Sequence, residues 1–255
     1  INERTGDIKL ASVYRDTYLD HTNGTYGKAT ECYAEGGAEL SINMLNKNLD
    51  LDITDFVTVN FNAIVEAVDL LGGIEIDVTE EELEWLNGYA YDLINQSQVE
   101  NYTTYEPLTS AGTQNLNGVQ ALAYCRIRYT TGWDFKRTER QREVLNKIFQ
   151  KAQSQGVTAL ASLVNQMLPD IATSLSNTEI LSLAAGIANY EIVDSIGFPY
   201  NQTTADIDAG DCVVPINLAD NVSQLHADLF GTEGYTPSDT VQQISNQIIS
   251  NTGIQ

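Results

Sequence analysis

Positive charge is scarce in this chain, which has 13 Lys and Arg residues against 35 Asp and Glu and a formal charge of −22. Nucleic acids and anionic lipid surfaces both bind to broad basic surfaces, so the composition excludes both as broad-surface partners. The two histidines and three cysteines form no CxxC pair or Cys-His cluster, which argues against zinc and against a Ser-His-Asp nucleophile. No apolar run reaches the length of a membrane-spanning helix.

Apolar residues, in contrast, are plentiful. Hydrophobic residues make up 42% of the chain, charged residues only 19%, and there are 13 tyrosines, so the chain can bury a core and is not a disordered acidic tail. Strand-like and helix-like segments alternate without a long Pro- or Gly-rich linker. We therefore expect one domain over residues 1–255 with α/β architecture.

Hydrophobic periodicity predicts the individual elements. The expected strands are 9–14, 55–61, 74–78, 124–129 and 191–198, and the expected helices are 35–48, 61–71, 117–124, 134–155, 157–168, 178–188 and 238–250. The Tyr-rich stretch 80–113 is expected to be a long irregular loop or lid. Its aromatic side chains could stack on sugars or pack against the domain; they are Trp85, Tyr89, Tyr91, Tyr102 and Tyr105.

The few basic residues are concentrated in one place. Six of the 13 lie between residues 126 and 142, and five of these six are arginines. Such a cluster repels itself unless carboxylates or an anionic ligand neutralise it, and the forked guanidinium group suits phosphate oxyanions. A phosphate or pyrophosphate site is one interpretation; a solvated helix face with pairs such as Glu139 and Arg142 is the other.

The expected secondary structure would bring these groups to one ligand. In a strand, Arg126 and Arg128 point to the same side, and on the next helix Arg137 and Gln141 share a face. Asp134 would cap that helix, whose N-terminus also attracts anions. Arg15 follows the first strand and could contribute from a neighbouring strand end.

Four segments resemble the LytR-CpsA-Psr family. YCRIRYTTGWDFKRTERQREVL resembles its Y-x-R-x-R strand and G-x-D-x-x-R-x-x-R-Q helix, and SVYRDTYLD resembles its S-x-x-R-D-T strand end. VNFNAIVEAVDLLGGIEIDV and LNGVQALAYCRIR resemble two further family segments, in the same order along the chain. Together they cover most of residues 9–150.

The resemblance implies a three-layer α-β-α sandwich around a mixed central sheet, and a specific activity. Family members are extracytoplasmic, membrane-anchored phosphotransferases that move a teichoic acid or capsular polysaccharide from a polyprenyl-pyrophosphate carrier to peptidoglycan, assisted by Mg²⁺. By resemblance, Arg15, Asp134 and Arg137 are the candidate catalytic residues. The residues expected to contact the pyrophosphate are Arg15, Arg126, Arg128, Arg137, Arg140 and Gln141.

The sequence departs from the family pattern at its start. The G-x-D-S-R and R-S-D-T motifs, whose aspartates bind the metal in the family, are absent from the 14 residues before Arg15. We therefore expect the chain to be a fragment whose metal ligands and membrane anchor lie upstream of Ile1. A protein that truly lacked them could instead be a non-catalytic module that binds polyprenyl phosphate or wall polymers.

Two further expectations concern thiols and the lipid. Cys125 lies in an apolar run and should be a buried free thiol, whereas Cys32 and Cys212 could form a disulfide in an oxidising compartment. Apolar stripes on two helices could line a tunnel for the prenyl chain with its mouth at the arginines, or could be ordinary core. These stripes are Val144, Leu145, Ile148 and Phe149, and Ile64, Val65 and Val68.

Overall fold

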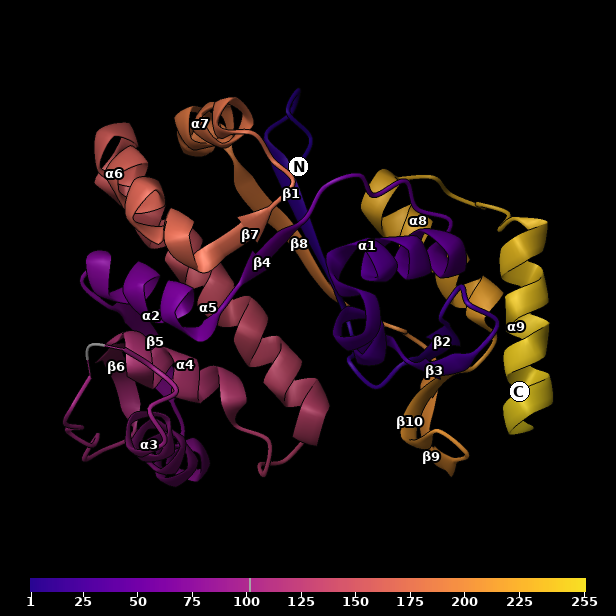
Figure 1. Cartoon of the computed structure of the whole chain (residues 1–255), viewed down its shortest axis with the longest axis horizontal. Coiled ribbons are helices and arrows are strands. Elements are labelled where there is room, and N and C mark those ends of the chain that lie inside the picture. Colours follow the sequence, from indigo (N-terminus) through magenta and orange to yellow (C-terminus); the bar gives the residue numbers. More distant parts are fainter. Residues whose placement is uncertain (101) are drawn as a thin grey trace. The chain divides into compact units, whose positions relative to one another are not determined.

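The computed structural model describes residues 1–100 and 102–255, which divide into two compact units (Figure 1). Unit 1 comprises Ile1–Ile8 and Val57–Val193, and unit 2 comprises Lys9–Phe56 and Asp194–Gln255. Each unit contains both helices and strands, which confirms the α/β class.

Unit 1 contains six of the helices. Its elements are β4 (Val57–Val59), α2 (Phe61–Leu70), β5 (Ile74–Val78), α3 (Glu80–Asn95), β6 (Gly112–Leu116), α4 (Gly118–Arg126), α5 (Trp133–Gln155), α6 (Val157–Met167), η1 (Leu168–Asp170), β7 (Ile171–Thr173), α7 (Asn177–Gly186) and η2 (Ile187–Asn189). The predicted helices 61–71, 134–155, 157–168 and 178–188 are confirmed within two residues, as is the strand 74–78.

Unit 2 is built around α1, with two helices near the C-terminus of the chain. Its elements are β2 (Tyr18–Asp20), β3 (Tyr26–Lys28), α1 (Ala29–Leu49), β9 (Gln202–Ile207), β10 (Gly210–Pro215), α8 (Leu218–Phe230) and α9 (Asp239–Thr252). Strands β1 (Asp7–Val13) and β8 (Glu191–Phe198) pair with each other and run side by side in Figure 1.

Strand pairing differs from the expected single central sheet. In the described residues the strands form five two-stranded sheets: β1 with β8, β9 with β10, β2 with β3, β4 with β7 and β5 with β6. The β5–β6 pair is antiparallel, and β5 buries Ile74, Ile76 and Val78 while Glu75 and Asp77 face outward. This alternation is the period-two pattern that identified the strand in the sequence.

The most buried helix of unit 1 is α4, which leads directly to the arginine cluster. Residues Gly118 to Cys125 are all buried, and only the last residue, Arg126, is partly exposed. A Cβ atom at Gly118 would lie 2.2 Å from the Val65 carbonyl oxygen, so only glycine allows α2 and α4 to approach this closely. The close packing fixes the end of α4 relative to the rest of the unit 1 core.

The predicted strand 124–129 is wrong. Arg126 ends α4, and Ile127 follows it with an extended backbone (φ −58°, ψ 124°) and a fully buried side chain. Arg126, Ile127 and Arg128 alternate between polar and apolar side chains, as residues of a strand do. Here the buried Ile127 side chain instead anchors a turn, with an arginine on each side of it. Residues 126–131 are called the arginine turn below.

The predicted loop or lid 80–113 is also wrong over its first half, because α3 occupies residues 80–95. Thr79 caps this helix by accepting from the Glu82 backbone N–H, and the Glu82 carboxylate accepts from the Thr79 N–H in return. Leu86, Ala90 and Leu93 are buried at helical spacing. The stretch is rich in tyrosine because exposed and half-buried rings cover the rest of this helix and the segment after it.

The disulfide prediction is wrong, since Cys32, Cys125 and Cys212 are all free and buried. Burial raises the pKa of the Cys32 thiol to about 11 and that of Cys125 to about 12. Cys32 and Cys212 both lie in the apolar core of unit 2, so they act as small hydrophobic residues despite their polar sequence neighbours. The free Cys125 agrees with the prediction.

Within residues 1–100 and 102–255, no helix combines the length and apolar character needed to cross a membrane.

Candidate anion-binding site

Arg126 is held at the end of α4 by three side chains. Its Nη1 donates to Gln98 Oε1 at 2.7 Å, and its guanidinium lies over the rings of Phe61 and Tyr89, at 5.3 and 5.7 Å from their centroids. Such cation–π contacts fix the plane of the guanidinium at a modest energetic gain. Arg126 is therefore oriented before any ligand binds.

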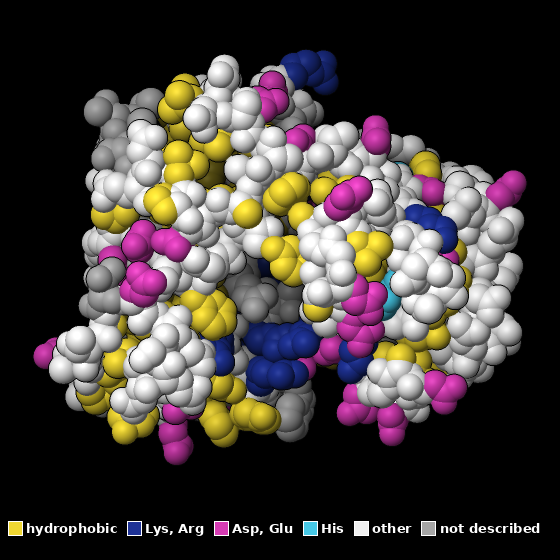
Figure 2. Space-filling model, viewed as in Figure 1, with side chains coloured by type: hydrophobic (Ala, Val, Ile, Leu, Met, Phe, Trp, Pro, Cys, Tyr) yellow, Lys and Arg dark blue, Asp and Glu magenta, His cyan; other side chains and the backbone are white. Residues whose placement is uncertain are grey.

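Asp134, in the first turn of α5, holds two more arginines. Arg128 donates to both of its oxygens, from Nε to Oδ1 at 3.0 Å and from Nη2 to Oδ2 at 2.8 Å. The Arg137 Nη1 lies 2.8 Å from Asp134 Oδ1. One carboxylate thus contacts two guanidinium groups, and these three residues carry a net positive charge. On the face drawn in Figure 2, dark blue Lys and Arg side chains occupy few places, whereas magenta Asp and Glu side chains are spread over it.

Arg126, Arg128 and Arg137 all lie close enough to Tyr89 to act on it electrostatically. Burial raises the pKa of Tyr89, and the positive charges of Arg126, Arg128 and Arg137 oppose that rise. All three guanidinium groups therefore act on the same phenol. The structure brings these residues together as the sequence predicted, although from a helix end and a turn and not from a strand.

Helix α3 lines this turn through residues spaced four apart. Glu81 accepts from the backbone N–H of Thr131 at 2.9 Å, the Trp85 ring lies 5.1 Å from the Tyr129 ring, and Tyr89 contacts Arg126. Side chains at this spacing lie on one face of a helix. Sequence reasoning missed this support because it placed no helix at residues 80–95.

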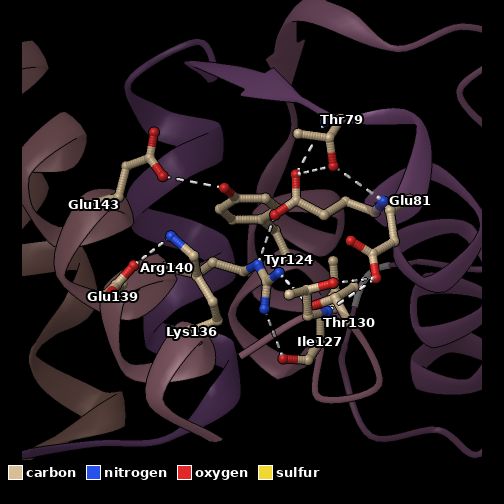
Figure 3. Close-up of polar contacts among 11 residues, drawn as sticks. Thr79, Glu81, Tyr124, Ile127, Thr130, Lys136, Glu139, Arg140 and Glu143 are labelled. Carbon is tan, nitrogen blue, oxygen red and sulfur yellow. Dashed lines mark hydrogen bonds and ion pairs between the residues drawn. The ribbon is translucent and has the colours of Figure 1, made fainter. Parts of the chain in front are cut away.

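Arg140, drawn in Figure 3, and its neighbour Gln141 both donate to backbone carbonyl groups. Arg140 is only 4% exposed and donates to Glu82 Oε1, to the Ile127 carbonyl and to Thr130 Oγ1. Gln141 Nε2 donates to the Cys125 carbonyl at 3.4 Å. Both residues were expected to contact the pyrophosphate; in the structure Arg140 contacts Glu82 and the turn around Arg128, and Gln141 contacts the residue before Arg126.

Arg15 belongs to unit 2, whereas the other predicted site residues belong to unit 1. Its side chain is 47% exposed, and its Nε lies 3.5 Å from Asp16 Oδ1. Lys28 Nζ lies 3.7 Å from the same oxygen. Sequence reasoning missed Lys28, whose signal was its place at the start of a helix shortly after the Arg-Asp-Thr segment.

The aromatic residues of the 80–113 stretch divide into two groups. Tyr89, Tyr102 and Tyr105 pack against the core of unit 1, as the packing interpretation predicted. Trp85 and Tyr91 are exposed, and Trp85 pairs with the exposed Tyr129 of the arginine turn.

Unit 1 also contains an apolar groove of about 380 Å³ between α5, α6 and α7 and the β4–β7 pair. Its lining is almost entirely aliphatic or aromatic and includes Phe149, Leu160, Leu163, Met167 and Leu183. Of the stripes expected to line a tunnel, only Phe149 is part of this lining, whereas Val65 and Val68 lie in the core. Among the described residues no arginine lines this groove, so a mouth at the arginine cluster is not observed there.

The described residues offer no group of three or more His, Cys, Asp or Glu side chains that could hold a metal ion. Asp134 and Asp16 are each engaged with two cationic side chains, which does not suit a divalent cation. Metal assistance therefore stays a prediction from the family resemblance.

Comparison with known proteins identifies the family. The model of the LytR_cpsA_psr family matches residues 1–224, which include all of unit 1 and part of unit 2. The chain belongs to the LytR_cpsA_psr family. Its relatives include the polyisoprenyl-teichoic acid–peptidoglycan teichoic acid transferase TagT of Bacillus subtilis, 28% identical over 203 residues, 78% of this chain and 59% of TagT.

Solved structures of family members share the fold. A protein from Enterococcus faecalis described as a transcriptional regulator is 25% identical, with a TM-score of 0.73 over 98% of this chain and 85% of that one. TagT with bound octaprenyl pyrophosphate lipid is 19% identical, with a TM-score of 0.62 over 100% of this chain and 82% of that one. The chain spans 59% of the length of TagT, its first curated relative above.

Proposed function

We propose that this chain is the phosphotransferase domain of a protein that moves a glycopolymer, of the teichoic acid or capsular polysaccharide type, from a polyprenyl-pyrophosphate carrier to peptidoglycan. The observation that carries the proposal is the set of oriented guanidinium groups: Arg128 and Arg137 are held by Asp134, and Arg126 is held by Gln98. A chain with a charge of −22 has few other places for a pyrophosphate. TagT supports the reaction type, because its name describes a teichoic acid transfer to peptidoglycan.

The arginines would act by stabilising charge. A sugar hydroxyl of peptidoglycan attacks the glycan-side phosphorus, forms a new P–O bond and loses its proton. The P–O bond to the polyprenyl phosphate breaks, and the bridging oxygen leaves with the electron pair. Guanidinium groups already oriented toward this charge lower the barrier without reorganising during the step.

Asp134 would orient the arginines. Its described contacts are to Arg128 and Arg137, which it binds through both oxygens. This arrangement favours orientation over proton transfer, the other role implied by the resemblance. Arg15 remains a predicted pyrophosphate contact by the family resemblance; within unit 2 it lies beside Asp16, whose Oδ1 is also close to Lys28.

The prenyl chain would bind in the apolar groove, and the glycan would stack on the exposed rings. A prenyl chain costs about 0.8 kcal/mol for each CH₂ left in water, so a site that handles it needs a bilayer or an apolar surface. The groove near Leu163 and Phe149 is the apolar surface available in unit 1. The Trp85–Tyr129 pair would stack on a sugar of the glycan. TagT with bound octaprenyl pyrophosphate lends support by analogy of fold.

The proposal places the full-length protein on the extracytoplasmic face of the membrane, held by an anchor, because carrier lipid and peptidoglycan meet there. The proposal includes metal assistance only because the family resemblance implies it, and the transfer step as written does not use a metal ion.

Incubation of the full-length protein with a lipid-linked glycan and peptidoglycan tests the activity. Transfer releases polyprenyl phosphate and makes the glycan sediment with peptidoglycan. Tight binding of the lipid-linked glycan without release of polyprenyl phosphate, with and without Mg²⁺, would instead identify a non-catalytic binding module.

A further inference from the structure

The arginine turn has no regular secondary structure after Arg126, yet it presents Arg128 toward Asp134 in a defined geometry. A turn of this kind must be held by side chains if its arginines are to stay oriented. The exposed Glu81 of α3 and the buried Arg140 of α5 both form hydrogen bonds with it (Figure 3).

Two nitrogens of the Arg140 guanidinium donate hydrogen bonds to this turn. Nη1 donates to the Ile127 carbonyl at 3.1 Å, which lies between Arg126 and Arg128, and Nη2 donates to Thr130 Oγ1 at 2.6 Å. Ile127 and Thr130 are themselves buried. The fork therefore fixes the backbone on both sides of Arg128.

Glu82 holds Arg140 from the other side. Its Oε1 accepts from Arg140 Nε at 2.7 Å, and its Oε2 accepts from the N–H and hydroxyl of Thr79 at 2.9 Å each. Burial alone would raise the pKa of Glu82, but the hydrogen bonds from Thr79 and Arg140 outweigh it and lower the pKa, so the pair is ionised at neutral pH. The Tyr124 ring lies 5.8 Å from the Arg140 guanidinium and completes the enclosure.

We propose that Arg140, ion-paired with Glu82, is a positioning residue that holds the arginine turn so that Arg126 and Arg128 face the pyrophosphate. Arg140 does not touch the substrate, because its described donors are used inside the protein and its side chain is 4% exposed. Gln141 assists from the adjacent position through the Cys125 carbonyl. The role in catalysis rests on the proposed function; the role in holding the turn does not.

The test uses two mild variants and one control. Arg140→Lys keeps a positive charge beside Glu82 but loses the fork, and Thr130→Val removes one acceptor of the fork with almost no change in shape. Glu139→Gln, on the exposed side of the same helix, breaks only the surface pair with Lys136. Each variant is first shown by circular dichroism to be folded at the assay temperature.

Amide hydrogen exchange over residues 126–131 measures the turn directly. We expect Arg140→Lys to exchange about tenfold faster than wild type, Thr130→Val to shift in the same direction, and Glu139→Gln to match wild type. Unchanged exchange over these residues in Arg140→Lys would overturn the proposal, whether or not the protein binds lipid.

Binding of geranylgeranyl pyrophosphate, with geranylgeraniol as the uncharged probe, then separates positioning from direct contact. We expect Arg140→Lys to bind the pyrophosphate about tenfold more weakly and the alcohol unchanged. In a background that lacks both arginines, Arg126→Ala with Arg128→Ala, Arg140→Lys should cause little further loss, because it acts through these two side chains. Fully additive losses would show a direct phosphate contact and refute the positioning role. A wild type that binds neither probe would refute the proposed function, while the exchange result would still decide how the turn is held.

Discussion

Replacing Arg128 with alanine removes one of the two guanidinium groups on Asp134 and leaves Arg137 in place. The side chains of the Arg128–Asp134 pair are 40% and 36% exposed, so solvent screens the pair and its contribution to stability is about 0–1 kcal/mol. A loss of that size lowers the melting temperature by no more than about 4 °C in a chain of this length. If Arg128 stabilises the charge on the leaving phosphate, transfer should fall by about 10² to 10³.

The assay for Arg128→Ala compares initial rates of glycan transfer with thermal unfolding followed by circular dichroism. Lys136→Ala is the matched control, since it removes a cation from the first part of α5 whose described partner is the exposed Glu139. We expect the control to keep both its rate and its melting temperature. A fall of more than about 10 °C in Arg128→Ala would mean that the arginine is structural, and a near-normal rate would mean that it does not contact the reacting phosphate.

Three further predictions concern other parts of the chain. Because the pKa of Glu82 in the folded protein lies below its ordinary value of 4.5, Glu82 stabilises the fold above that pH and loses this contribution on acidification, so unfolding free energies from pH 6 to 2 should fall less steeply in Glu82→Gln than in wild type. Thiol titration in denaturant without reductant should give three free thiols, and the native protein should react with none at pH 8; one free thiol would restore the disulfide. Trp85→Ala should weaken binding of a glycan-bearing lipid about threefold to tenfold relative to bare prenyl pyrophosphate, and equal weakening of both ligands would remove its role in sugar binding.

Elements with a clear hydrophobic period were predictable. Helices α2 and α5 and strand β5 follow their patterns within a residue or two, because one face of each is buried against the rest of unit 1. The sequence also contains helix-capping patterns for two helices that the sequence analysis did not predict. Thr79 and Glu82 form a capping box before α3, and Asn217 caps α8, in which Leu218, Val222 and Leu225 are buried at helical spacing.

The position of α1 shows a limit of local patterns. The predicted helix 35–48 corresponds to its second part, because the helix begins at Ala29 and kinks at Gly36 and Gly37. Gly37 has φ +64° and ψ −154°, which glycine tolerates and other residues resist. Two glycines indicate a helix boundary in a sequence, and only the packing around them shows that the chain continues as a helix on both sides.

The roles within the arginine cluster could not be read from spacing. Arg137 and Arg140 lie three residues apart on α5, yet Arg137 contacts Asp134 and Arg140 is enclosed with Glu82 from α3. The difference depends on a carboxylate 58 residues away in sequence, and no local pattern contains that information. The concentration of arginines between residues 126 and 142 predicted a candidate anion site, whereas only the tertiary structure separates Arg140, which holds the backbone, from Arg126 and Arg128.

In each unit one carboxylate contacts two cationic side chains. In unit 1 a single carboxylate, Asp134, contacts Arg128 and Arg137, and in unit 2 a single carboxylate, Asp16, contacts Arg15 and Lys28. Each group contains two positive charges and one negative charge, so the carboxylate orients its partners without cancelling them. The Arg140–Glu82 pair, by contrast, is one to one, as expected for a buried pair that must be neutral. In a chain with 35 acidic residues, each two-to-one group keeps a net positive charge that attracts an anion, whereas the neutral Arg140–Glu82 pair holds the arginine turn.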